Sequence, residues 1–253
     1  MADDGQASFT VTDQERAFYD RAWAAGTYSG PEPNGDESCR LSAMTALLDR
    51  YVGPYRRERR LLDVGCGRGW LTAKLSGYGT AVGLDPVSTS AEHARRLFPH
   101  LEFHATDSVH WAATHPSGYD VVVSSEVIEH VRDTEKPVFL RSLADLVAGN
   151  GYVLLTSPRG EVREQYFRTG ASNQPVEDWV TARALDQLAA GVGLRRVVRT
   201  RAYFDGVTFD SHFSRLAHHW RVQRLRARRL TRPVARWIEH LAAIYQVVLY
   251  AKR

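Results

Sequence analysis

The chain has 253 residues, enough for one decorated domain, and its 43% hydrophobic and 25% charged residues are ordinary for a globular protein. No apolar run approaches the roughly 18 residues that cross a bilayer, and the polar start MADDGQASFT lacks the features of a secretory signal, so we expect a cytoplasmic protein with no transmembrane association. The net charge of +4 is divided unevenly, with +11 from Arg195 onward and −7 before it.

Two helices are expected ahead of the first strand. Apolar and aromatic residues recur at helical spacing over 13–26, which ends at Gly26, a residue suited to a C-cap. The stretch 28–37 contains Gly, Pro and Asn in quick succession and is typical of a loop. A second helix of about 15 residues is expected over 38–52.

Short apolar runs then alternate with amphipathic segments. The first five runs are RLLDVG (60–65), TAVGLD (80–85), LEFHA (101–105), YDVVVSS (119–125) and GYVLLTS (151–157). Strands that alternate with helices imply βαβ units and a parallel sheet, so the predicted fold class is doubly wound α/β. Two more runs, at 194–204 and 245–253, are expected to be closing strands that flank a long helical insertion.

A glycine-rich turn follows the first run. Gly65, Gly67 and Gly69 are spaced G-x-G-x-G, and Asp63 precedes them by two residues. Such a turn lets the backbone approach a ligand closely, and Asp85, which ends the next run, is placed to accept hydrogen bonds from a ribose diol. Dinucleotide folds use G-x-G-x-x-G, so the spacing disfavours a nicotinamide oxidoreductase.

A third polar position follows the next predicted strand. Asp107, with Ser108, is placed so that its carboxylate can take an adenine amino group. Structural interpretations exist as well, because the glycines can simply form a tight turn and Asp85, followed by Pro86, can be a helix-entry aspartate.

Over roughly 12–200 the sequence resembles class I S-adenosylmethionine-dependent methyltransferases, through LDVGCGRG, the strand-end acids and the segment SSEVIEHV, and most closely the ubiquinone-biosynthesis type of O-methyltransferase. The resemblance implies a Rossmann-like seven-stranded sheet, mostly parallel with an antiparallel last strand. It also implies a donor site for S-adenosylmethionine. The residues expected there are Tyr28, Asp63, Gly65, Cys66, Gly67, Asp85, Pro86, Asp107, Ser108 and Ser124.

The segment EVIEHV (126–131) follows the fourth predicted strand, at the sheet edge where open α/β folds bind ligands. If a helical turn begins here, Glu126 shares a face with Glu129 and His130. His130 is then the first candidate for a general base, and the three together are a candidate Mg²⁺ site. Alternatively, Glu129 and His130 cap and support the helix. Weaker candidates for the base are His212, His218 and His219.

The chain is expected to divide into four segments: an N-terminal helical lid (1–55), a donor-binding core (56–204), a helical insertion on the substrate side (205–242) and a final strand (243–253). The aromatics Tyr19, Trp23 and Tyr28 resemble those that cover donor and acceptor in related enzymes. Phe18 and Trp23 are equally suited to be core anchors.

Arginines with interleaved aromatics fill the insertion. They are Arg215, Arg221, Arg224, Arg226, Arg228, Arg229, Arg232 and Arg236, with Phe213 and Trp220 among them. Arginine binds carboxylate or phosphate, so the pattern favours an anionic or carrier-tethered acceptor. It also suits single-stranded nucleic acid or an anionic membrane surface, or it is simply a solvated face.

The function expected from these features is O-methylation of a small molecule, in specialised metabolism, with S-adenosylhomocysteine as the product. The alternatives are N-methylation of a small molecule, methylation of RNA or tRNA through the basic C-terminal region, and a donor-binding scaffold without catalysis. The scaffold is disfavoured because Gly65, Gly67 and Asp85 are all present.

Overall fold

The apolar runs of the sequence pair into one seven-stranded sheet in the computed structural model, which describes residues 11–24, 29–115, 117–169, 174–204, 237 and 240–252. The strands are β1 (Arg60–Val64), β2 (Thr80–Asp85), β3 (Glu102–Ala105), β4 (Tyr119–Ser125), β5 (Val147–Pro158), β6 (Leu194–Ala202) and β7 (Tyr245–Lys252). Their order is β3-β2-β1-β4-β5-β7-β6. β1 to β5 are parallel, whereas β7 is antiparallel to both β5 and β6, which confirms the predicted fold class.

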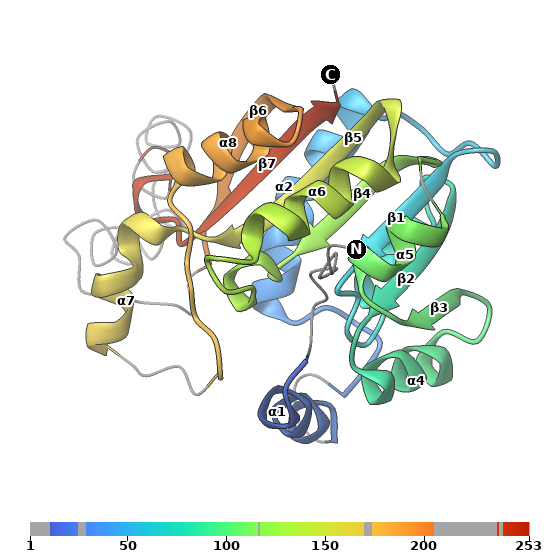
Figure 1. The fold of residues 1–253 in the computed structure, drawn as a ribbon, viewed down its shortest axis with the longest axis horizontal. Coiled ribbons are helices and arrows are strands. Elements are labelled where there is room, and N and C mark those ends of the chain that lie inside the picture. Colours follow the sequence, from blue (N-terminus) through green and yellow to red (C-terminus); the bar gives the residue numbers. More distant parts are fainter. Residues whose placement is uncertain are drawn as a thin grey trace, which may run out of the picture.

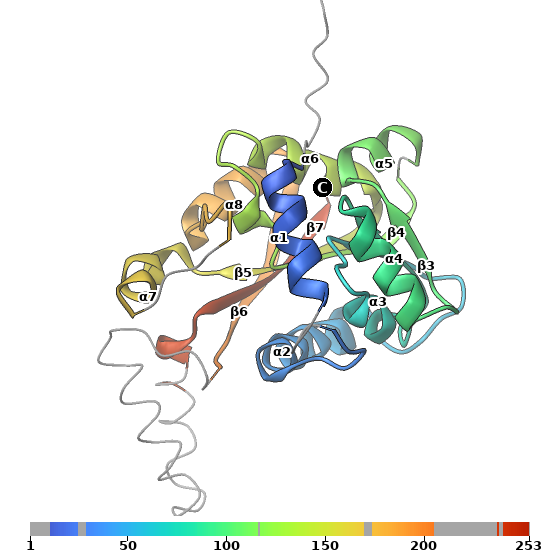
Figure 2. The ribbon, with the colours of Figure 1, turned by 90° about the horizontal axis from the view of Figure 1, so that it is seen from below.

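Helices cover both faces of the sheet (Figure 1). One face carries α2 (Gly35–Tyr51), α3 (Trp70–Leu75) and α4 (Ser88–Leu97), and the other carries α5 (Ser108–Thr114), α6 (Lys136–Leu146) and α8 (Ala182–Gly191), as Figure 2 shows. The remaining elements are α1 (Asp13–Ala24), α7 (Arg163–Thr169) and the short 3₁₀ helices η2 (Ile128–His130) and η3 (Gly160–Val162). None of the described helices is long and apolar enough to cross a membrane.

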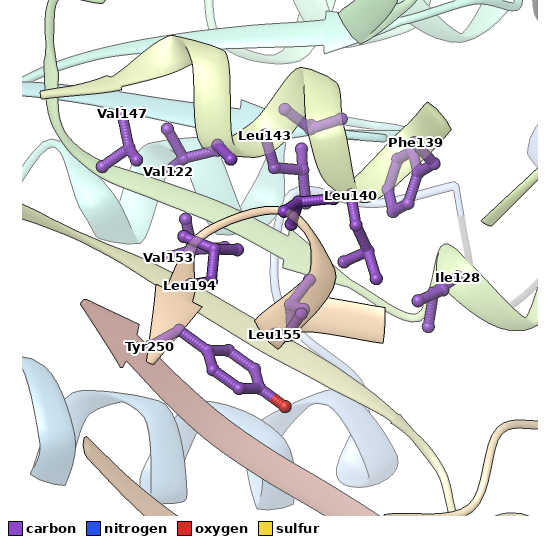
Figure 3. Close-up of a cluster of buried hydrophobic side chains, with 14 of the residues drawn as sticks. Val122, Ile128, Phe139, Leu140, Leu143, Val147, Val153, Leu155, Leu194 and Tyr250 are labelled. Carbon is purple, nitrogen blue, oxygen red and sulfur yellow. The ribbon is translucent and has the colours of Figure 1, made fainter. Parts of the chain in front are cut away.

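The central strands contribute side chains to two separate hydrophobic cores, one on each face of the sheet. In β4, Val122 packs with Leu140 and Leu143 of α6 (Figure 3), whereas Val121 and Val123 belong to the cluster on the opposite face. Successive side chains of a strand point to opposite faces, so a strand that is covered on both sides must be apolar at every position. This is why the sequence shows unbroken apolar runs rather than alternation.

The second helix, α2, begins at Gly35, three residues earlier than predicted. The loop that is expected over 28–37 therefore ends earlier in the structure than in the prediction. Asn34 caps α2 by accepting a hydrogen bond from the backbone nitrogen of Glu37 at 2.8 Å, and the Glu37 carboxylate accepts the backbone nitrogen of Asn34 at 2.8 Å. This reciprocal pair is a capping box, whose signature Asn-x-x-Glu is legible in the sequence.

The two predicted N-terminal helices occupy different positions. Met44 and Leu48 of α2 lie in the core on one face of the sheet. In contrast, α1 lies outside both helical layers and packs against α4 (Figures 1 and 2). The predicted insertion falls largely on residues 205–236, which lie outside the described part of the chain. The division into four segments therefore stays a prediction.

Candidate active site

A cavity of about 650 Å³ lies at the carboxyl ends of the parallel strands. Its floor is the glycine turn that joins β1 to α3, together with the ends of β2 and β4. Phe18 and Tyr19 of α1 line it from the open side. Ligands of open α/β sheets bind at this edge, so the cavity is the candidate active site. We call the part beside Gly65–Gly69 the glycine-loop end, and the part beside η2 the His130 end.

The glycine turn has a backbone that only glycine adopts readily. Gly65, Gly67 and Gly69 have φ angles of 77°, 52° and 82°. A Cβ on Gly65 would lie 2.3 Å from Cγ2 of Val127, so a side chain there would also clash. These glycines therefore serve both the left-handed turn and the close approach of the segment after β4.

Two buried carboxylates flank the glycine turn. Asp63 is 1% exposed and accepts a hydrogen bond from the Thr72 hydroxyl at 2.6 Å, and burial raises its pKa to about 7. Burial likewise raises the pKa of Asp85 to about 6, although its oxygens accept the backbone nitrogens of Gly67 and Val87, both at 2.9 Å. A cationic ligand in the cavity would favour the ionised form of both groups.

Other predicted binding residues have different surroundings. Asp107 lines the cavity, but it caps α5, accepting the backbone nitrogens of Val109 and His110, and its second oxygen lies 2.5 Å from Nδ1 of His110. Both of its oxygens thus already have protein partners, so an adenine amino group would be a further donor to a carboxylate that also caps the helix. The Ser108 hydroxyl is bonded to Ser142 at 2.6 Å.

The last residues of β4 lie differently with respect to the cavity. Ser124, which is expected to face the donor through its backbone, is 1% exposed and is not among the lining residues, whereas its neighbour Ser125 is. Adjacent residues of a strand point to opposite sides, so the Ser125 side chain is the one directed to the cavity. Cys66 and Pro86 line the cavity as predicted, and Tyr28 lies outside the described residues.

A buried ion pair that the sequence did not indicate supports the glycine turn. Arg68 is 1% exposed and makes hydrogen bonds to the Glu37 carboxylate at 2.7 and 2.5 Å. Its guanidinium also donates to the carbonyl oxygens of Gly30 and Glu32. The pair joins the turn to the start of α2, and no motif links these two positions in the sequence.

The His130 end contains two neighbouring carboxyls, of which Glu129 is buried and Glu126 is partly buried. Glu126 follows β4 in a left-handed conformation with φ of 57°, and η2 begins two residues later, so the two glutamates meet through a backbone turn rather than through the expected helical spacing. Burial raises the pKa of Glu129 to about 8 and that of Glu126 well above its ordinary value. Arg40 lies 3.8 Å from Glu126 and opposes both shifts.

His130 is held in a defined orientation. Its Nδ1 lies 2.9 Å from the carbonyl oxygen of Val176, which can only accept, so Nδ1 carries a proton, and in the neutral imidazole Nε2 is the nitrogen with a free electron pair. The backbone nitrogen of Asp178 donates to the carbonyl oxygen of Glu129 at 2.8 Å. These two bonds fasten the segment 174–181 to η2, and the His130 side chain lines the cavity.

The combination of fold and site corresponds to a known family. A family model described as a methyltransferase domain matches residues 37–245, which is most of the chain and includes the lining residues of the cavity except Asp36 and those between 11 and 22. The chain belongs to this methyltransferase family. The predicted class of enzyme and the predicted resemblance are therefore confirmed.

Relatives of this methyltransferase extend the comparison. Ubiquinone biosynthesis O-methyltransferases of Yersinia pestis and Yersinia pseudotuberculosis are 34% identical to it over 116 residues, a match that covers 44% of this chain and 46% of theirs. The chain thus matches less than half the length of these curated relatives.

Solved structures share the fold. The N-methyltransferase NodS from Bradyrhizobium japonicum WM9, in complex with S-adenosylhomocysteine, superposes with a TM-score of 0.64 at 16% identity and covers 95% of this chain and 99% of its own. A TehB-like SAM-dependent methyltransferase from Corynebacterium glutamicum gives a TM-score of 0.56 at 15% identity, over 96% and 100% of the two chains.

One expectation for the methyltransferase is not supported by the structure, and another lies outside the described residues. No group of three or more His, Cys, Asp and Glu side chains in the described ranges is arranged to hold a metal ion, so the Mg²⁺ site expected from Glu126, Glu129 and His130 is not supported. The weaker candidates for the base, His212, His218 and His219, and the Arg-rich part of the insertion lie outside the described residues.

Several residues of the cavity wall were missed from the sequence. They are Arg40, Tyr166, Glu177, Trp179, Phe204 and Tyr245. They come from α2, α7, the segment before α8, the end of β6 and the start of β7, so only the folded chain brings them together. No local spacing pattern could have identified them.

Proposed function

We propose that the protein transfers a methyl group from S-adenosylmethionine to a hydroxyl oxygen of a small-molecule acceptor and releases S-adenosylhomocysteine. The observation that carries this proposal is that one cavity joins the glycine turn and its two buried aspartates to an oriented imidazole. The partial match to O-methyltransferases supports oxygen as the atom that is methylated.

The donor is assigned to the glycine-loop end. There Gly65, Cys66 and Gly67 supply backbone groups, Asp63 favours the positively charged amino acid part, and Asp85 with Pro86 flanks the ribose. Each oxygen of Asp85 accepts one backbone nitrogen of the loops, and the carboxylate has acceptor capacity left for a ribose hydroxyl. Asp107 and Ser108 contact the adenine through backbone and carbon atoms in this proposal, because their side-chain oxygens have other partners.

His130 is assigned as the proton acceptor. When bound, the donor supplies an electrophilic methyl group on a sulfonium that leaves as a neutral thioether. His130 Nε2 removes the proton of the acceptor hydroxyl while that oxygen forms the new bond to the methyl carbon, and the bond between carbon and sulfur breaks. Most of the rate in such a displacement comes from holding the reactants in line, which is the work of the cavity walls. No step requires a metal ion.

The replacement His130→Gln tests this assignment. Loss of a general base typically lowers kcat by about 100-fold or more, with little change in the affinity for the donor. The measurement uses a panel of hydroxyl-bearing compounds with S-adenosylmethionine, and identifies the methylated atom by NMR. An N-methylated product from an acceptor that offers both groups, or an unchanged kcat in the variant, would contradict the proposal.

A further inference from the structure

The cavity wall is strongly acidic. Among the described residues that line it, ten are Asp or Glu and three are Arg. The three guanidiniums are already engaged with carboxylates of the wall, in the pairs Arg40 with Asp36, Arg68 with Glu37 and Arg132 with Glu135. The wall as a whole therefore favours ligands with a positive charge.

A cationic donor offsets the carboxylates at only one end of the cavity. Asp63 and Asp85 lie beside the glycine turn, where the donor is assigned. Glu126 and Glu129 lie at the His130 end, and among the described residues the guanidinium that faces them is that of Arg40, which also pairs with Asp36. The acceptor part of the cavity therefore keeps an excess of carboxylates that the donor does not offset.

Glu129 is the least compensated of these groups. Its side chain is 2% exposed, and its Oε2 has no hydrogen-bond partner among the described residues. The other oxygen lies 3.9 Å from Nε2 of His130, whose ring proton is directed to Val176. A buried carboxyl oxygen without a partner costs free energy unless a ligand supplies the missing donor or charge.

Aromatic rings lie on the same side of the cavity. The rings of Tyr166 and Trp179 are 5.0 Å apart, and the Trp179 indole donates to the Glu177 carboxylate at 2.5 Å. Both rings line the cavity, and the bond from Asp178 to the Glu129 carbonyl keeps the segment of Trp179 beside η2. Carboxylates combined with aromatic faces are the usual means by which proteins bind ammonium groups.

We propose that the acceptor carries a positively charged amino group, and that Glu129 binds this group at the His130 end of the cavity, next to the atom that is methylated. The proposal rests on the proposed function and narrows its acceptor to amine-bearing hydroxyl compounds. In this arrangement Glu126 and Arg40 interact with the Glu129 carboxyl, while Tyr166 and Trp179 flank the ammonium group.

The test compares three probes of similar size that differ in charge. The full chain is first saturated with S-adenosylhomocysteine, and then titrated calorimetrically with tyramine, 4-ethylphenol and 4-hydroxyphenylacetate. We expect tyramine to bind at least about tenfold more tightly than either of the others. In Glu129→Gln this preference should fall to less than about threefold, whereas Glu164→Gln, on the exposed surface of α7, should retain it.

Each other outcome overturns the inference. These outcomes are equal or tighter binding of the neutral or anionic probe, no binding of any probe, and a preference for tyramine that survives in Glu129→Gln. Binding of MgCl₂ that requires Glu129, without a preference for tyramine, would replace the amine site with a metal site. The affinity for S-adenosylhomocysteine keeps the two proposals apart and reports on folding of the variant. If this product does not bind, the proposed function fails, whereas normal binding without an amine preference removes only the inference.

Discussion

The two ends of the cavity are built in different ways. The glycine-loop end is made within residues 63–85, where the backbone of the glycine turn and two aspartates near the ends of β1 and β2 set the geometry. The His130 end is made by side chains from five elements that are distant in the sequence. The first end has little freedom to vary without disturbing the fold, whereas the second can change its side chains and keep the fold. This difference is what a common donor and a variable acceptor require.

The largest loss of stability is expected when the buried ion pair that supports the glycine turn is broken. Glu37→Gln leaves the buried Arg68 guanidinium without its countercharge, which should lower the free energy of unfolding by about 3–5 kcal/mol. The control Glu32→Gln removes the exposed pair with Lys74 and should cost less than about 1 kcal/mol. Urea unfolding measures both. Equal losses would show that Arg68 is not a structural support of the turn.

A smaller loss of stability is expected from a substitution in the glycine turn itself. Gly65→Ala combines a left-handed backbone with a clash against Val127, and should cost about 2–4 kcal/mol of stability and most of the donor affinity. Gly53→Ala is a matched control, because Gly53 has φ of 80° but open space around its Cβ position, and should cost only about 1–2 kcal/mol. Similar losses in both variants would mean that the close approach to Val127 is unimportant.

The buried aspartates give donor binding a defined pH dependence. Their pKa values in the folded protein, about 7 for Asp63 and about 6 for Asp85, lie above the ordinary value of 3.8. Their neutral forms therefore favour folding at low pH, and this contribution is lost as the pH rises through 6 to 7. A cationic donor needs the ionised forms, so its affinity should rise by about tenfold or more between pH 5 and pH 8. Calorimetry on Asp63→Asn should show a flatter profile, and an affinity that falls with pH would contradict the assignment.

The sequence predicted the fold and the glycine-loop end because both depend on local patterns. Apolar runs mark strands that are covered on both faces, and the glycines and aspartates lie within a few residues of strand ends. The sequence is less informative where one position or one bond matters. The cavity is lined by Ser125 rather than Ser124, the Asp107 carboxylate also caps α5, and the capping box at Asn34 was overlooked.

The His130 end could not be predicted in the same way. His130 and the two glutamates were found because they share one segment, but Arg40 and Trp179 reach the cavity only through tertiary packing. The ion pair of Arg68 with Glu37 spans 31 residues and leaves no periodic signal. Side chains that meet through packing have no fixed spacing in the chain, so a single sequence does not reveal them.

Calorimetric titration of the wild type and of Asp85→Asn with S-adenosylmethionine tests the central claim most directly. We expect the wild type to bind S-adenosylmethionine and not NADH, and the variant to lose at least about tenfold in affinity, a difference of roughly 1.4 kcal/mol. A folded wild type that does not bind S-adenosylmethionine, or a variant that binds it as tightly as the wild type, would contradict the assignment of the donor to the glycine-loop end.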